Sequence, residues 1–143
     1  MIVRPMLIED YNAVYGLWSS TAGMGMRSLD DSLEGITRFL NRNPTTCFVA
    51  ELDKQIAGVI LCGQDGRRGY IYHTAVNPDY RKRGIGKALV NATLEALKKE
   101  QINKVALVVF ATNRLGNEFW EHIGFEVRND LVYRNISLNT QNT

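Results

Sequence analysis

The chain has 143 residues, of which 45% are apolar and 22% charged, and its formal net charge is +2. These values are typical of one folded globular domain and argue against long disordered segments. The net charge is too small to predict nucleic-acid binding, and the longest apolar run, 105–111, is far too short to cross a membrane. The first residues lack the apolar core of a signal peptide, so we expect a cytoplasmic protein.

The spacing of apolar residues predicts alternating strands and helices along the chain. The expected order is a strand, two helices, three strands, a helix, a strand, a helix and two final strands. The strands are expected at Met1–Pro5, Cys47–Leu52, Ile56–Cys62, Tyr70–Val76, Val105–Phe110, Phe125–Arg128 and Leu131–Ile136, and the helices at Glu9–Ser20, between Asp31 and Pro44, at Gly84–Gln101 and at Arg114–Ile123. This order predicts one α+β domain, residues 1–143, with a mixed sheet, helices on both faces and a frayed tail at 138–143.

The strand at 105–110 is expected to be central, because its continuous apolar run suits a strand that is covered on both faces.

A basic loop that contains two glycines connects the strand at 70–76 to the longest helix. It reads Arg81-Lys82-Arg83-Gly84-Ile85-Gly86-Lys87. The first N–H groups of a helix have no acceptor inside the helix, and together with the helix dipole they attract anions. Gly84 and Gly86 carry no side chain that would keep a phosphate away from the backbone, and the basic residues add positive charge. The loop therefore predicts a pyrophosphate-binding site.

Two common phosphate-binding motifs do not fit this loop. A P-loop requires Ser or Thr after Gly-Lys, but Ala88 follows Lys87. A dinucleotide-binding loop requires a third glycine, and Leu89 occupies that position. The segment from Arg81 to Gly86 does match Arg/Gln-x-x-Gly-x-Gly/Ala, the coenzyme A loop of the GNAT acetyltransferases.

The chain resembles the GNAT family well beyond this loop. Residues 72–80, Tyr-His-Thr-Ala-Val-Asn-Pro-Asp-Tyr, are similar to the family's strand that enters the loop, and residues 119–125 to the segment that closes its acetyl-CoA cleft. Residues 4–18 resemble the family's first strand and helix. The resemblance implies a GNAT-like mixed, mostly antiparallel sheet of about seven strands, splayed at its central parallel strands to admit the pantetheine arm.

Acetyl-CoA is the co-substrate that the resemblance implies. The backbone of Ala75 and Val76 would hydrogen-bond the coenzyme and polarise the thioester carbonyl. Asn113 would contact the pantetheine arm, and Phe119 would help to close the cleft. The other cofactor-binding residues implied are those of the loop: Arg81, Lys82, Arg83, Gly84, Ile85, Gly86 and Lys87. No metal is expected, because the two His and two Cys residues lack the spacing of metal ligands.

The acid and base of the reaction are less evident from the sequence. The family often protonates the leaving thiolate with a Tyr, but that position, seven residues after Asn113, holds Trp120. A carboxylate that some members place on the strand at 105–110 is replaced by Val108. Tyr133, on a late strand, is another residue that could protonate the thiolate.

Tyr70 and Tyr72 match the positions where the family often places a base or the group that holds its water. Strand alternation predicts that both tyrosines and Thr74 lie on one face and His73 on the other. His73 has the more suitable side chain for a base but the less suitable predicted side, so we rank Tyr72 and Tyr70 before it.

The resulting hypothesis is an N-acetyltransferase in which a primary amine attacks acetyl-CoA directly in a ternary complex. The acceptor would be a small molecule or a peptide or protein amine, and a homodimer is possible. Neither cysteine has a His or Asp partner that would make it an acyl-carrying nucleophile. The alternative is a non-catalytic acyl-CoA sensor or regulatory module. Nucleic-acid and membrane partners are not expected, since aromatic stacking platforms and long apolar segments are absent.

Overall fold

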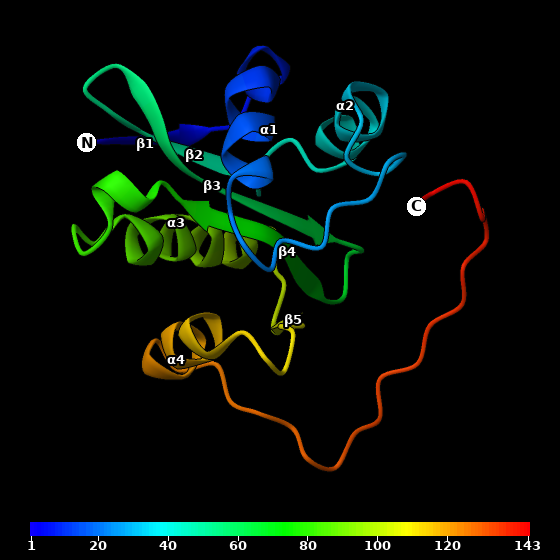
Figure 1. Cartoon of the computed structure of the whole chain (residues 1–143). Helices are drawn as coiled ribbons and strands as arrows, with labels where there is room; N and C mark the ends of the chain where they lie inside the picture. The colour runs from blue at the N-terminus through cyan, green and yellow to red at the C-terminus, as the bar shows by residue number, and fades with distance from the viewer.

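The computed structural model describes all 143 residues and contains one five-stranded sheet in the order β1-β2-β3-β4-β5. Helices cover both faces of this sheet, with α1 and α2 on one side and α3 on the other (Figure 1). The strands are β1 (Ile2–Pro5), β2 (Phe48–Leu52), β3 (Gln55–Gln64), β4 (Gly69–Val76) and β5 (Val105–Leu107). The helices are α1 (Tyr11–Ser19), α2 (Leu33–Arg42), α3 (Ile85–Lys99) and α4 (Arg114–His122), with short 3-10 turns at Ile8–Asp10 and Pro78–Tyr80.

Neighbouring strands are antiparallel from β1 to β4, and only β4 and β5 are parallel. A parallel pair needs a crossover, and α3 supplies it by running along the sheet between these two strands. The predicted mixed α+β architecture with helices on both faces is therefore confirmed. No helix combines the length and the apolar composition that crossing a bilayer requires.

Each face of the sheet has its own apolar core. The core under α1 and α2 includes Val14, Trp18 and Ile36, and the core under α3 includes Ile71, Ile85 and Leu89. The sheet approaches α3 closely at glycines. A Cβ atom on Gly58 would lie 2.9 Å from Cγ2 of Ile85, and one on Gly69 would lie 3.0 Å from a methyl group of Leu97.

A bulge interrupts β4 in its middle. Ile60 of β3 pairs with Thr74, whereas Cys62 pairs with Ile71, so both Tyr72 and His73 lie opposite the single residue between Ile60 and Cys62. The extra residue changes which side chains point to which face after this point. The bulge therefore decides the side on which the candidate catalytic residues lie.

The two strands predicted at Phe125–Arg128 and Leu131–Ile136 are not formed, so the prediction of about seven strands is wrong. After α4 the chain leaves the sheet and runs as an extended segment (orange to red in Figure 1). Val132 and Ile136 are 77% and 84% exposed, because no strand pairs with this segment. A pattern of alternating residues predicts that a segment can form a strand, but it does not supply the neighbouring strand that it needs.

Without those strands, β5 is the edge of the sheet rather than a central strand covered on both faces. It spans only Val105–Leu107, and the side chains of Val108 and Phe110 are each 58% exposed. The end of the chain returns to the loop between α1 and α2. There the backbone of Ser28 donates to the Thr143 carbonyl at 2.8 Å, and the Asn142 side chain accepts from the backbone of Leu29 and Asp30.

Candidate active site

The loop between β4 and α3 is shaped by a turn and two residues with positive φ. The side chain of Asn77 accepts from the backbone of Asp79, and Pro78 begins the short 3-10 turn that follows. Lys82 has φ 62° and Gly84 has φ 76°, and Gly84 forms the left-handed N-cap of α3. This geometry turns the chain so that successive N–H groups are left without acceptors.

Every backbone N–H from Lys82 to Lys87 lacks a hydrogen-bond acceptor in the protein, and the first intrahelical bond runs from Ala88 to Gly84 at 3.0 Å. A Cβ atom on Gly84 would meet nothing within 4 Å, so the space in front of this backbone is open. Consecutive free N–H groups at the positive end of a helix bind anions well. The loop therefore presents a run of free N–H groups toward open space in front of α3.

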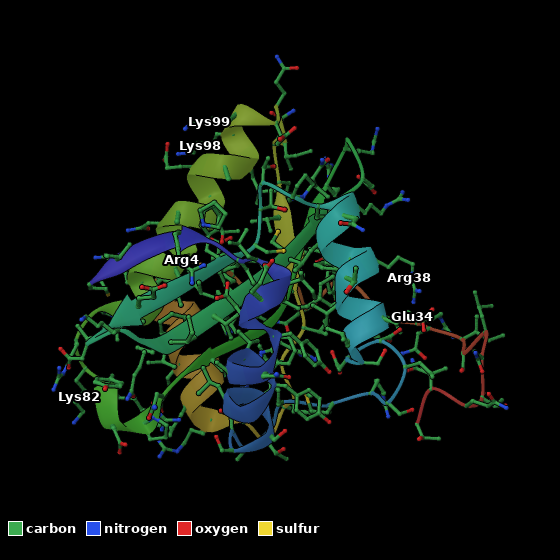
Figure 2. All side chains as sticks on the ribbon, turned by 90° about the horizontal axis from the view of Figure 1, so that it is seen from above. Arg4, Glu34, Arg38, Lys82, Lys98 and Lys99 are labelled. Carbon is green, nitrogen blue, oxygen red and sulfur yellow. The ribbon has the colours of Figure 1, made fainter.

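Basic side chains surround these N–H groups. Arg81, Lys82, Arg83 and Lys87 are all exposed, and none of them forms an ion pair with the protein. Lys82 extends outward from the loop that precedes α3, while Lys98 and Lys99 lie at the far end of the same helix (Figure 2). The guanidinium of Arg83 lies 5.4 Å from the centre of the Tyr80 ring. The positive charge is therefore free to meet an anionic ligand.

The absence of a side chain at Gly86 also makes room for α4. A Cβ atom at this position would lie 3.1 Å from the Phe119 ring and 3.7 Å from a methyl group of Val76. The missing side chain therefore leaves room for Phe119 of α4, while Gly84 faces the open space. The structure nevertheless brings together three predicted cofactor-binding residues, Val76, Gly86 and Phe119, from separate segments.

The edge of β4 that faces β5 is open over half of its length. β5 pairs with β4 only from Gly69 to Ile71, so 72–76 have no strand neighbour on that side. Ala75 and Val76 lie in this open stretch, which leads directly into the anion-binding loop. An extended ligand held at the loop can therefore lie along β4 and reach the fork between the strands near Tyr72. This fork agrees with the splayed parallel strands that we expected.

The three predicted catalytic tyrosines come together at this fork. The rings of Tyr70 and Tyr72 are 4.8 Å apart, and Tyr72 packs edge-on against Phe39 of α2 at 5.6 Å. Burial, helped by the nearby hydroxyls of Tyr133 and Tyr72, raises the pKa of Tyr70 to about 12. Burial also raises the pKa of Tyr72, and Tyr133 and Asp30 add to the rise. Both phenols are therefore protonated at neutral pH and suit proton donation or relay better than proton removal.

His73 lies on the same face as Tyr70 and Tyr72, so the predicted separation of His73 from the tyrosines is wrong. Nε2 of His73 is 2.8 Å from Oδ1 of Asp31, and its ring packs edge-on against Trp18 of α1 at 5.0 Å. The bulge of β4 is the reason, because it places two consecutive side chains on the α1 and α2 face. No sequence signal marked Asp31 as a partner, because it lies 42 residues from His73 in the chain.

The side chains of Asn113 and Trp120 make structural contacts at α4. The Asn113 side chain accepts from the Gly116 backbone at 3.0 Å as the N-cap of the helix, and Trp120 packs edge-on against Phe119 and Phe125.

Burial raises the pKa of the Cys47 thiol to about 12 and that of Cys62 to about 11, so neither is an activated nucleophile. No group of three His, Cys, Asp or Glu side chains is close enough to hold a metal ion.

Two hollows on the surface involve other parts of the molecule. One lies on the outer side of α2, where Figure 2 labels Glu34 and Arg38, and it is wide open. The other lies between α3 and α4 and includes Asn91 and His122. The second hollow adjoins Lys87, the last residue of the run of free N–H groups, and neither hollow includes the open edge of β4.

A family model described as Acetyltransferase (GNAT) family matches residues 9–125, which include the anion-binding loop, the fork and α4. The chain belongs to the GNAT acetyltransferase family. Within this family it is similar to an acetyltransferase of Sodalis glossinidius (strain morsitans), with 31% identity over 92% of each chain. It is 32% identical, over 88% of each chain, to an acetyltransferase of Pectobacterium atrosepticum.

The GNAT fold also appears in the comparison with solved structures. The PaiA N-acetyltransferase of Thermoplasma acidophilum, solved in complex with coenzyme A, superposes with a TM-score of 0.78. The two chains are 21% identical, and the match covers 89% of this chain and 90% of the other. At this identity the similarity shows the fold of this GNAT acetyltransferase.

Proposed function

We propose that this acetyltransferase moves the acetyl group of acetyl-CoA to a primary amine, which attacks the thioester directly while both substrates are bound. The observation that carries the proposal is the run of free N–H groups from Lys82 to Lys87 in front of α3. A pyrophosphate is the part of coenzyme A that such a run would bind. The coenzyme A in the PaiA structure supports the choice of this ligand.

The rest of the coenzyme would follow the open edge of β4. Peptide groups of Ala75 and Val76 would hydrogen-bond the pantetheine arm as a neighbouring strand does, and one N–H would polarise the thioester carbonyl. The thioester would then lie at the fork, beside Tyr70 and Tyr72. No cysteine is activated to carry the acetyl group, which supports direct attack by the amine.

A calorimetric titration of CoA tests the binding site. Lys82→Gln removes a free charge beside the N–H groups, and we expect it to weaken CoA binding about tenfold, since hydrogen bonds to charged groups are worth about 1.5–3 kcal/mol. Lys99→Gln is the matched control, because Lys99 is an exposed, unpaired lysine at the other end of α3 (Figure 2). Equal affinities of the two variants, or no heat from the wild-type chain, would contradict the proposed site.

Release of free thiol from acetyl-CoA tests the reaction itself. A panel of small amines and amino-terminal peptides should accelerate thiol release in proportion to the amide formed. A non-catalytic acyl-CoA sensor is the second candidate, and it is favoured by Trp120, which occupies the expected acid position and is packed between two aromatic rings. Binding of CoA without amine-dependent thiol release would support the sensor.

A further inference from the structure

A largely buried hydrogen bond between a histidine and an aspartate joins β4 to the loop before α2, close to the open edge of β4. His73 and Asp31 are 2.8 Å apart, and their side chains are only 16% and 7% exposed. A carboxylate removed from water is costly unless it is paired and hydrogen-bonded. This pair lies at the bulge, one residue after Tyr72, where the thioester is expected.

Contacts from α1 and from the loop before α2 hold the pair in place. Trp18 of α1 packs edge-on against the His73 ring, with the ring planes at 69°. The other oxygen of Asp31 accepts from the Arg27 backbone at 2.7 Å, and the Tyr11 hydroxyl donates to the Asp31 carbonyl at 2.7 Å. Only Nε2 of the imidazole is used, and Nδ1 has no hydrogen-bond partner in the protein. The ring is therefore oriented, and one nitrogen is available.

We propose that His73 is the base that removes a proton from the attacking amine, and that Asp31 is a positioning residue that fixes the orientation of its ring. The inference rests on the proposed function, because a base at the fork is needed only if an amine attacks there. When Nε2–H donates to Asp31, Nδ1 keeps its lone pair, as in other Asp–His pairs that serve as general bases. Tyr70 and Tyr72 lie on the same face and are protonated at neutral pH, which leaves the removal of the proton to His73.

The protons and electrons of the step balance with these groups. The acceptor ammonium gives one proton to Nδ1 of His73 and becomes a neutral amine. The nitrogen lone pair forms a bond to the carbonyl carbon, and the C–S bond breaks with its electron pair on the sulfur. The second N–H proton goes to the sulfur, with the hydroxyl of Tyr70 or Tyr72 as a relay. His73 then loses its proton to water, so the products are the amide, the free thiol and one proton.

Other titratable groups lie near the pair and would shape its pH dependence. Tyr11 contacts the Asp31 carbonyl from α1, and Asp30 precedes Asp31 in the loop. Tyr72 neighbours His73 on β4, and Arg27 contacts Asp31 through its backbone. Trp18, which covers the ring from α1, does not titrate.

Turnover and CoA binding of His73→Gln, Asp31→Asn and the matched variant His122→Gln separate catalysis from binding. His122 is the other histidine of the chain and lies exposed at the end of α4. We expect His73→Gln to lower kcat by about 10²–10⁴-fold and to remove the acidic limb of the pH–rate profile. Its CoA affinity and that of Asp31→Asn should equal that of the wild type, and Asp31→Asn should lower kcat without raising KM for acetyl-CoA. His122→Gln should leave all of these quantities unchanged.

If the pair were only structural, its loss would also lower turnover, through local unfolding. Chemical rescue is therefore measured as well. His73→Ala leaves a space beside Trp18, and added imidazole should restore part of its turnover in a saturable manner. Full turnover in His73→Gln, or an unchanged acidic limb, would overturn the base and leave the proposed function intact. Failure of imidazole to restore turnover in a folded, CoA-binding His73→Ala chain would also overturn it. A wild-type chain that binds CoA but releases no thiol with any amine would instead overturn the proposed function and the base together.

Discussion

The two faces of the sheet are built from different kinds of contacts. On the α3 face, apolar side chains pack against glycines so closely that one added carbon at Gly58 would collide with Ile85. On the α1 and α2 face, the apolar core gives way along the first part of β4 to tyrosines and to the His73–Asp31 pair. The tightly packed face therefore fixes the helix that follows the glycine loop. The other face tolerates polar groups where chemistry is proposed.

The sharpest test of this difference is an added side chain on the α3 face. Gly58→Val should lower the free energy of unfolding by about 1–3 kcal/mol or more, because Ile85, Leu89 and the Ala75 carbonyl all lie within 3.2 Å of the new Cβ. Denaturant unfolding measures the change. Gly16→Ala of α1 is the control with the opposite sign. Nothing lies within 4 Å of its Cβ, so better helix propensity should add about 1 kcal/mol of stability. A stable Gly58→Val chain would remove the distinction between the faces.

A second test addresses the contact between α3 and α4. Gly86→Val should displace the Phe119 ring, which would lie 3.1 Å from the new Cβ, and so should remove most of the thermal stabilisation that CoA gives. At a CoA concentration about 100 times its dissociation constant, the wild-type chain should gain about 2.7 kcal/mol. The unliganded variant should still melt cooperatively, because Phe119 is a side chain that can rotate away. Undiminished stabilisation by CoA would show that the contact between Gly86 and Phe119 is not needed for CoA binding.

A smaller effect is expected from a single hydroxyl on the opposite face. Tyr72→Phe removes a group that is half exposed and makes no hydrogen bond through its hydroxyl within the protein, so stability should change by less than about 0.5 kcal/mol. If the hydroxyl relays a proton, turnover should fall about tenfold or more while CoA binding is unaffected. Steady-state kinetics beside a calorimetric titration measures both quantities. Unaltered kinetics would remove Tyr72 from the mechanism.

The smallest expected effect on stability comes from the ionisation of Tyr70 at high pH. Its pKa is raised from 10.0 to about 12 in the folded chain, first by burial. The folded state therefore favours the neutral phenol, and this contribution to stability is complete below pH 10 and is lost as the pH rises through about 12. Phenolate absorbance, compared between the wild type and Tyr70→Phe, should show one tyrosine that ionises late. A difference spectrum that titrates near pH 10 would contradict the burial of Tyr70.

The sequence allowed the helices and the position of the glycine loop before α3 to be predicted, because their signals are local. Gly84 and the basic residues before it define the start of α3 within a few positions, and the left-handed conformation of Gly84 agrees with that expectation. The hairpin between β2 and β3 is equally local, since only Asp53 and Lys54 separate Leu52 from its partner Gln55. Local signals of this kind need no knowledge of the rest of the fold.

What could not be predicted depends on partners that are distant in the sequence. The bulge at Tyr72 and His73 arises from the register between β3 and β4, and no residue type marks it. Asp31 meets His73 only after α1 and β4 pack together. Residues 125–136 have the composition of strands, yet they have no neighbour to pair with. Each feature that was not predicted therefore depends on which segments pair or pack together, not on which element a segment can form by itself.

The bulge also makes the site sensitive to chain length. Since side chains alternate along a strand, a deletion of one residue at 72–73 would turn the remainder of β4 over, exchanging the orientations of Ala75 and Val76. The peptide groups that face the fork would rotate with them. The side chains that precede α3 would then point to the opposite faces of the sheet. A single-residue insertion elsewhere in a surface loop has no such effect. The number of residues between the tyrosines and the glycine loop is therefore as important to the site as the identity of those residues.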